Sequence, residues 1–160
     1  MSEKSYPHRK RPIHLPAFEN CNRSVIQFVT VCTHDRQKVL ANDETHALFR
    51  DLWNDDSVYR VGRYVIMPDH LHLFCSPNKY PIQSLGRWVR FWKSRVATQF
   101  PLELDKKLWQ RDHWDRQLRR GDSYSEKWQY VVRNPVRAGL VRSPDDWEYS
   151  GELYQLTWHD

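Results

Sequence analysis

The strongest constraint on the fold is the stretch 64–75, which reads Tyr-Val-Ile-Met-Pro-Asp-His-Leu-His-Leu-Phe-Cys. Its alternating pattern predicts a β-strand on which His70 and His72 share one face, because side chains in a strand alternate with a period of two. Leu71 and Leu73 would anchor the other face in a core, leaving both imidazoles free to converge on a metal ion. Half-exposed cross-strand partners show the same spacing, so spacing alone leaves both interpretations open.

The length of 160 residues suits one domain with a hydrophobic core and is short for two. No apolar run reaches the length of a membrane span, and the polar N-terminus lacks the apolar core of a signal peptide. We therefore expect a soluble, cytoplasmic protein with no membrane partner. The three cysteines are odd in number and widely spaced, which argues against a disulfide framework and a Cys-x-x-Cys zinc site.

Positive charge is concentrated in one segment of a chain whose net charge is +5. Residues 81–120 hold ten Lys/Arg against four Asp/Glu, interleaved with six Trp and Phe residues. Cations beside aromatic rings suit a nucleic-acid backbone with unstacked bases. The alternative is that the aromatic residues form the core and the charges a solvated face. The predicted phosphate contacts are Arg87, Arg90, Lys93, Arg116, Arg119 and Arg120, with Arg9, Lys10 and Arg11 in a basic N-terminal arm.

Hydrophobic patterning predicts the order strand, helix, strand, strand, helix, strand, followed by two helical segments. This order is typical of an α+β sandwich, in which helices cover one face of an antiparallel sheet. The strand that carries His70 and His72 would be central. The other predicted elements are strands 24–32 and 58–67, an ambiguous segment 108–118, and helices 43–53, 81–100, 123–132 and 136–140.

A second group of polar residues lies near the C-terminal end. Tyr130 and Asn134 stand four apart, and on a helix a hydroxyl and a carboxamide oxygen at this spacing can approach one ion. A tyrosine that only packs is the alternative. Asp69 and Glu126 are candidates for orienting an imidazole by hydrogen bonding, with a turn cap and a surface charge as their respective alternatives.

Four motifs in a fixed order resemble the REP-associated tyrosine transposases, bacterial relatives of the single-tyrosine insertion-sequence transposases with a His-hydrophobic-His motif. The motifs are Phe-Val-Thr-Val-Cys-Thr-His-Asp-Arg at 28–36, Val-Ile-Met-Pro-Asp-His-Leu-His-Leu at 65–73, Leu-Trp-Gln at 108–110 and Tyr-Val-Val-Arg-Asn-Pro-Val-Arg-Ala-Gly-Leu-Val at 130–141. The resemblance implies a catalytic domain over 24–151, between a basic arm (1–23) and a C-terminal tail (152–160).

The resemblance also implies a role for each site residue. Tyr130 stands at the position of the nucleophile, and His70, His72 and Asn134 stand at the positions of three metal ligands. The implied fold is a ferredoxin-like sandwich with the histidines on a central strand. The implied partner is single-stranded DNA whose palindromic repeats fold into hairpins. The repeat-associated branch favours a monomer, although insertion-sequence relatives form dimers that share active sites.

The expected chemistry is cleavage and rejoining of DNA. A phenol hydroxyl is almost entirely protonated at neutral pH and needs help to attack a phosphodiester. Mg²⁺ or Mn²⁺ on the three neutral ligands would supply that help, and the product would be a 5′-phosphotyrosine link. Two alternatives remain: a domesticated hairpin-binding protein without cleavage activity, and a nicking enzyme such as a replication initiator or relaxase.

Overall fold

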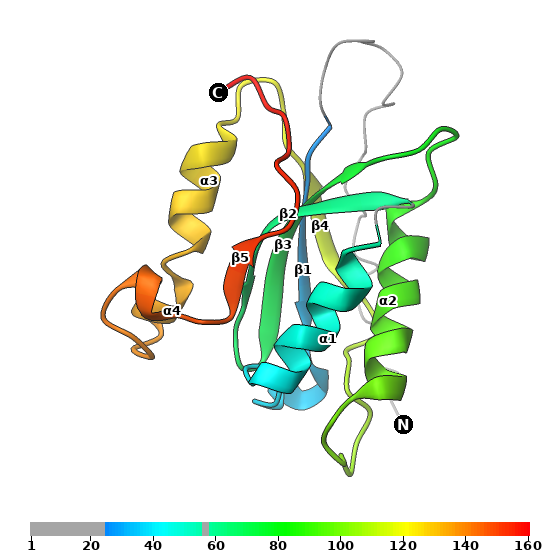
Figure 1. Cartoon of the computed structure of the whole chain (residues 1–160), viewed down its shortest axis with the longest axis vertical. Helices are drawn as coiled ribbons and strands as arrows, with labels where there is room; N and C mark the ends of the chain where they lie inside the picture. Colours follow the sequence, from blue (N-terminus) through cyan, green and yellow to red (C-terminus); the bar gives the residue numbers. More distant parts are fainter. Residues whose placement is uncertain (1–24, 56–57) are drawn as a thin grey trace, which may run out of the picture.

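The computed structural model describes residues 25–55 and 58–160 and contains a five-stranded antiparallel sheet (Figure 1). The strand order is β4-β1-β3-β2-β5, so the histidine strand is central, and the predicted α+β class is confirmed. The strands are β1 (Gln27–Cys32), β2 (Tyr59–Ile66), β3 (His70–Pro77), β4 (Trp114–Gln117) and β5 (Ser150–Glu152). Within the described residues, no helix is long and apolar enough to cross a membrane.

The helices lie on both faces of the sheet. Helices α1 (Asp43–Trp53) and α2 (Leu85–Gln99) cover one face, and the first four strands with these helices follow the β-α-β-β-α-β order of ferredoxin-like folds. The prediction that the helices cover one face of the sheet is confirmed for α1 and α2. Helix α3 (Tyr124–Val131) differs and packs on the opposite face, followed by the short helix α4 (Asn134–Arg137).

Helix α3 packs on the face of β3 that carries Phe74 and the two histidines. Leu71 and Leu73 are fully buried in the core beneath α1 and α2. Phe74 points the other way and packs against Tyr124 of α3, with ring centroids 5.0 Å apart. Side chains two residues apart in a strand point to the same face, so His70 and His72 lie on the face of Phe74. Helix α3 therefore lies on the face that carries the histidines. The strand therefore fixes which side of the sheet can carry chemistry.

Several element boundaries differ from the predicted ones for local reasons. The side chain of Ser84 accepts a hydrogen bond from the main-chain nitrogen of Arg87 and caps α2, so this helix begins at Leu85 and excludes Pro81. Pro135 lies in the first turn of α4, where a proline needs no hydrogen-bonded N–H, and α4 therefore begins at Asn134. Strand β5 was not predicted.

An aromatic cluster forms the core beneath α1 and α2. Trp53 and Trp92 are almost fully buried, with ring centroids 5.5 Å apart at 89°. We expect Trp92→Ala to lower the free energy of unfolding by about 3–5 kcal/mol, because it leaves a large cavity in the core. Urea denaturation measures this change. The matched variant Phe91→Ala, one residue away at an exposed position, should stay within about 0.5 kcal/mol of the parent. Equal losses in both would contradict this description of the core.

Candidate active site

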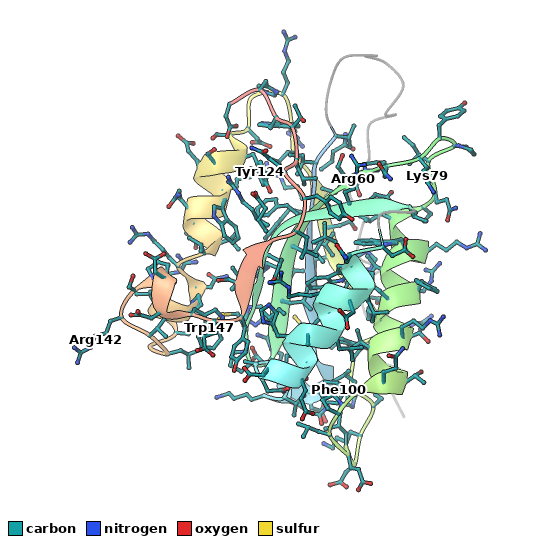
Figure 2. All side chains as sticks on the ribbon, viewed as in Figure 1. Arg60, Lys79, Phe100, Tyr124, Arg142 and Trp147 are labelled. Atoms are coloured by element: carbon teal, nitrogen blue, oxygen red, sulfur yellow. The ribbon has the colours of Figure 1, made fainter. Side chains whose placement is uncertain are left out.

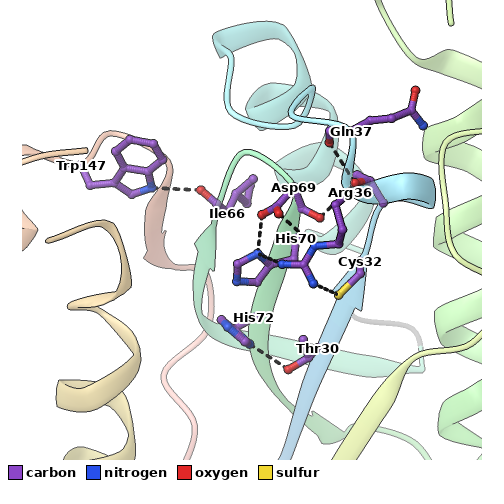
Figure 3. Close-up of polar contacts among 10 residues, drawn as sticks. Thr30, Cys32, Arg36, Gln37, Ile66, Asp69, His70, His72 and Trp147 are labelled. Atoms are coloured by element: carbon purple, nitrogen blue, oxygen red, sulfur yellow. Dashed lines mark hydrogen bonds and ion pairs between the residues drawn. The ribbon is translucent and has the colours of Figure 1, made fainter. Parts of the chain in front are cut away.

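His70 and His72 project from β3 toward the same side of the sheet (Figure 3). Their ring centroids are 5.0 Å apart, and the rings are nearly perpendicular at 80°. Both residues are only partly buried, so the pair is not sealed inside the core. This is the arrangement that the sequence predicted for the pair.

His70 is held by Asp69 and Arg36. Its Nδ1 lies 2.7 Å from Asp69 Oδ1, and Arg36 Nε donates to Asp69 Oδ2 at 2.9 Å (Figure 3). Burial opposes ionisation of Asp69, but the hydrogen bonds from His70 and Arg36 outweigh it and hold the pKa of this carboxyl below its usual value. An ionised carboxylate can only accept, so Nδ1 of His70 carries the proton. The lone pair of Nε2 is therefore left for a ligand.

The turn before His70 is bound to the segment that follows β1. The main-chain carbonyl of Asp69 accepts from Thr33 N and Oγ1, both at 3.0 Å. Asp35 and Arg36 both adopt a φ of 53°, a left-handed conformation that is uncommon for residues other than glycine. This backbone conformation turns the chain so that the Arg36 side chain reaches Asp69. Strained conformations of this kind cluster at functional sites.

His72 is the more deeply buried imidazole. Its Nδ1 lies 2.8 Å from Thr30 Oγ1, directly across the β1–β3 ladder, and its ring stacks on Phe28 with centroids 5.3 Å apart. Burial lowers the pKa of His72 to about 3, with smaller contributions from the charges of His70, Arg137 and Arg36. His72 is therefore neutral at ordinary pH. The Thr30 hydroxyl can accept from Nδ1, and in that tautomer Nε2 presents a free lone pair.

Tyr130 and Asn134 are joined by Arg137. Tyr130 is 67% exposed near the end of α3, and Asn134 opens α4. The Arg137 guanidinium lies 4.1 Å from the centroid of the Tyr130 ring and donates to Asn134 Oδ1. The two residues thus sit on successive short helices rather than on one, and Arg137 bridges them. An amide oxygen has two lone pairs, so Asn134 can accept from Arg137 and still face a cation.

Arg137 also connects this pair to the histidines. Its positive charge contributes to lowering the pKa of His72, so the guanidinium is within electrostatic reach of that ring. Among the described residues, no group of three or more His, Cys, Asp or Glu side chains is placed to hold a metal ion. A cation at His70 and His72 would therefore need a neutral ligand such as the Asn134 amide, or oxygens of a substrate.

Comparison with known proteins decides the family. The family described as "Transposase IS200 like" matches residues 21–130. This chain belongs to the IS200-like transposase family. A REP-associated tyrosine transposase of Escherichia coli is 24% identical over 143 residues, covering 82% of each chain. A relative from Haemophilus influenzae is 24% identical over 158 residues, covering 83% of this chain and 86% of the relative. The resemblance inferred from the motifs is confirmed.

A solved structure supports the same fold for this transposase. The structure of a REP-associated tyrosine transposase bound to a REP hairpin superposes with a TM-score of 0.65 at 21% sequence identity. The match covers 80% of this chain and 76% of that protein. The α+β fold with its antiparallel sheet is therefore shared with it.

The basic residues predicted to contact DNA are divided between the two faces of the transposase. Arg87 and Arg90 are exposed on α2, which packs on the face opposite to the histidines. The prediction that Lys93 contacts a phosphate is wrong. Lys93 is only 6% exposed, and its Nζ donates to the carbonyls of Gln110 (2.8 Å) and Arg111 (3.4 Å). It stabilises the α2 packing and is not presented to a phosphate.

The remaining predicted positions lie around β4 and α3. Arg116 is exposed on β4, and Arg119 and Arg120 are exposed in the connection that follows it. Glu126 is exposed on α3, and no hydrogen bond or ion pair joins it to His70 or His72. The three predicted basic contacts of the N-terminal arm, Arg9, Lys10 and Arg11, lie outside the described residues.

Two residues of the site of this transposase were not predicted from the sequence, Thr30 and Arg36. Thr30 lies on the same face of β1 as the histidines do on β3, so the alternation of side chains carried a signal for it. Arg36 carried no signal, because its role depends on a left-handed turn. Helical spacing did place Arg137 near Tyr130 and Asn134, but its contacts with both depend on the break between α3 and α4.

Proposed function

We propose that this transposase cleaves and rejoins single-stranded DNA through Tyr130, with Mg²⁺ or Mn²⁺ held beside the scissile phosphate. The observation that carries the proposal is Arg137, which contacts both Tyr130 and Asn134 and acts electrostatically on His72. A tyrosine and an amide thus contact one guanidinium, and that guanidinium acts electrostatically on the neighbouring imidazole of His72. The proposal includes a monomer as the active form, as the resemblance to the repeat-associated branch implies, with Tyr130, Asn134 and both histidines supplied by the same chain.

The covalent step is a transfer of the phosphodiester. The Tyr130 oxygen forms a bond to phosphorus, the bond from phosphorus to the 3′-oxygen breaks, and the phenolic proton is lost to solvent while the departing oxygen gains one. The product is a 5′-phosphotyrosine with a free 3′-hydroxyl end. Because the phosphoester energy is retained, a 3′-hydroxyl can attack the link, release Tyr130 and rejoin the strands without a nucleotide cofactor.

The donor set fits a hydrated divalent cation. His70 Nε2, His72 Nε2 and Asn134 Oδ1 would hold it, and all three donors are neutral, which leaves room for phosphate oxygens. A bound cation neutralises charge as it develops on the phosphate and on the departing oxygen. Asp69 and Thr30 keep the Nδ1 side of each imidazole occupied, so that each ring presents Nε2.

The DNA partner is proposed to be a hairpin formed by palindromic repeats, because the related transposase of known structure is bound to a REP hairpin. The test is incubation with hairpin oligonucleotides from the host genome in the presence of Mg²⁺, Mn²⁺ or a chelator, followed by a denaturing gel. We expect cleavage and a covalent adduct that require the metal. Cleavage in the presence of chelator would contradict the role of the histidine pair. Hairpin binding with no adduct under any condition would favour the domesticated binding protein.

The Arg36 side chain provides a prediction about the metal site. Arg36→Gln removes the cation that holds Asp69 against His70. We expect the affinity for Mn²⁺, measured by calorimetric titration, to fall about tenfold to a hundredfold, as is typical when an outer hydrogen-bond partner of a metal ligand is lost.

The matched control for this variant is Arg142→Gln. Figure 2 shows Arg142 projecting away from the molecule, and its side chain is exposed. The control should bind Mn²⁺ as the parent does, and both variants should unfold at nearly the parent temperature. An unchanged Mn²⁺ affinity in Arg36→Gln would show that Asp69 orients His70 without help.

A further inference from the structure

A pocket of about 380 Å³ lies between α3 and the histidine face of the sheet. Phe74, Leu118 and Val131 line it and are buried, so its interior is apolar. Phe28 adds an aromatic ring, and Tyr130 forms part of the wall. The pocket therefore opens beside the residue that we propose as the nucleophile.

The pocket and the histidine site occupy neighbouring rows of the sheet. Thr30 pairs with His72 in one row, and Phe28 pairs with Phe74 in the next row of the same face. These rows are separated by two residues along the strand, or roughly 7 Å. The Phe28 ring stacks on His72 on one side and lies 4.9 Å from the Phe74 ring. A group in the pocket would thus be held about one nucleotide away from a phosphate at the histidines.

The lining of the pocket has a net positive charge, because the cations Arg116 and Lys127 outnumber the single carboxylate, Glu126. Arg116 lines the pocket and pairs with Phe28 across β1 and β4. Its side chain is 57% exposed, and its nearest acidic partner is Asp122 at 3.7 Å, which is longer than a hydrogen bond. The guanidinium therefore retains donors for a phosphate. Lys127 also lines the pocket.

We propose that this pocket binds a single unstacked nucleobase of the DNA strand whose phosphate is attacked by Tyr130. The proposal rests on the proposed function of Tyr130. An apolar, aromatic-walled cavity whose charged lining is net positive matches a nucleotide, which joins a flat π-face to an anionic phosphate. Binding the base would fix the position of the adjoining phosphodiester relative to the tyrosine oxygen and the histidine pair, and would contribute to the rate through orientation.

The test uses a series of hairpin oligonucleotides, each with one abasic residue at a different position around the cleaved bond. The rate of covalent adduct formation is measured on a denaturing gel. We expect one position next to the cleaved phosphate at which loss of the base slows the reaction about tenfold to a hundredfold. Its neighbours should respond less.

Two pocket variants identify where the sensitive base binds. Phe28→Leu removes the aromatic face, and Leu118→Phe fills part of the cavity while retaining Phe28, the ring that stacks on His72. We expect each variant to form adduct with the intact oligonucleotide about tenfold more slowly than the parent. In each variant, removing the sensitive base should then slow adduct formation much less than it does in the parent. The control is Phe91→Leu, at an exposed position on α2, which should keep the full abasic effect.

The outcomes separate the two proposals. If the parent protein forms no adduct with any intact hairpin, the proposed function itself fails. If adduct forms but no abasic position slows it, or if the abasic effect persists undiminished in Phe28→Leu and Leu118→Phe, the pocket proposal is overturned while the role of Tyr130 stands.

Discussion

Tyr130→Phe is expected to abolish the covalent adduct while leaving hairpin binding intact. The substitution removes one oxygen and retains the ring on which Arg137 stacks at 4.1 Å. Loss of an essential nucleophile lowers turnover by at least about a thousandfold, so no adduct should be seen on a denaturing gel. A gel-shift assay with the same labelled hairpin should give the affinity of the parent protein.

The matched control is Tyr80→Phe, because Tyr80 is 79% exposed and lies outside the site. This variant should form adduct at the parent rate. If Tyr130→Phe still forms adduct, another group attacks the phosphate and the assignment of the nucleophile is wrong. If it fails to bind the hairpin, the hydroxyl contributes to binding rather than to chemistry alone.

His72→Ala is expected to have the second largest effect, a loss of at least about a hundredfold in Mn²⁺ affinity together with loss of cleavage. His72 is kept neutral by burial, with its pKa lowered to about 3, so its whole contribution at ordinary pH is a lone pair rather than a charge. Removing it leaves His70 and Asn134, too few protein ligands to hold the ion beside the phosphate. Calorimetric titration with Mn²⁺ measures the first effect, and the adduct assay measures the second.

The control for this substitution is His113→Ala. His113 lies near the start of α2, 3.5 Å from Asp115, and takes no part in the site. It should bind Mn²⁺ and form adduct as the parent does. Parent-like cleavage by His72→Ala, with its fold verified by circular dichroism, would remove the histidine pair from the mechanism.

Features encoded by local periodicity were predictable from the sequence. Alternation in 70–75 placed both histidines on one face and two leucines on the other, and the structure has them so. The Asn42 cap of α1 was also readable, and its side chain accepts from Thr45 N at 2.9 Å. The burial of Lys93 could also have been predicted from the sequence, because Lys93 follows Val89 by four residues and so lies on the buried face of α2.

Features that depend on contacts between distant segments were not predictable. The position of α3 on the histidine face depends on Phe74 meeting Tyr124, fifty residues away (124 − 74 = 50). Arg36 reaches Asp69 only because two non-glycine residues adopt a left-handed backbone. Strand β5 is three residues long and exists because it pairs with the edge of β2. No periodicity within a single segment encodes these contacts.

The most direct test of the central claim is to locate the adduct on the protein. The parent protein is incubated with a hairpin oligonucleotide and Mn²⁺, digested with nuclease and trypsin, and analysed by tandem mass spectrometry. Cleavage after Lys127 and Arg133 releases the peptide 128–133, in which Tyr130 is the only tyrosine. We predict a nucleotide phosphate on this peptide, at Tyr130. A phosphorylated nucleotide on any other residue, or none on a protein that cleaves DNA, would contradict the account.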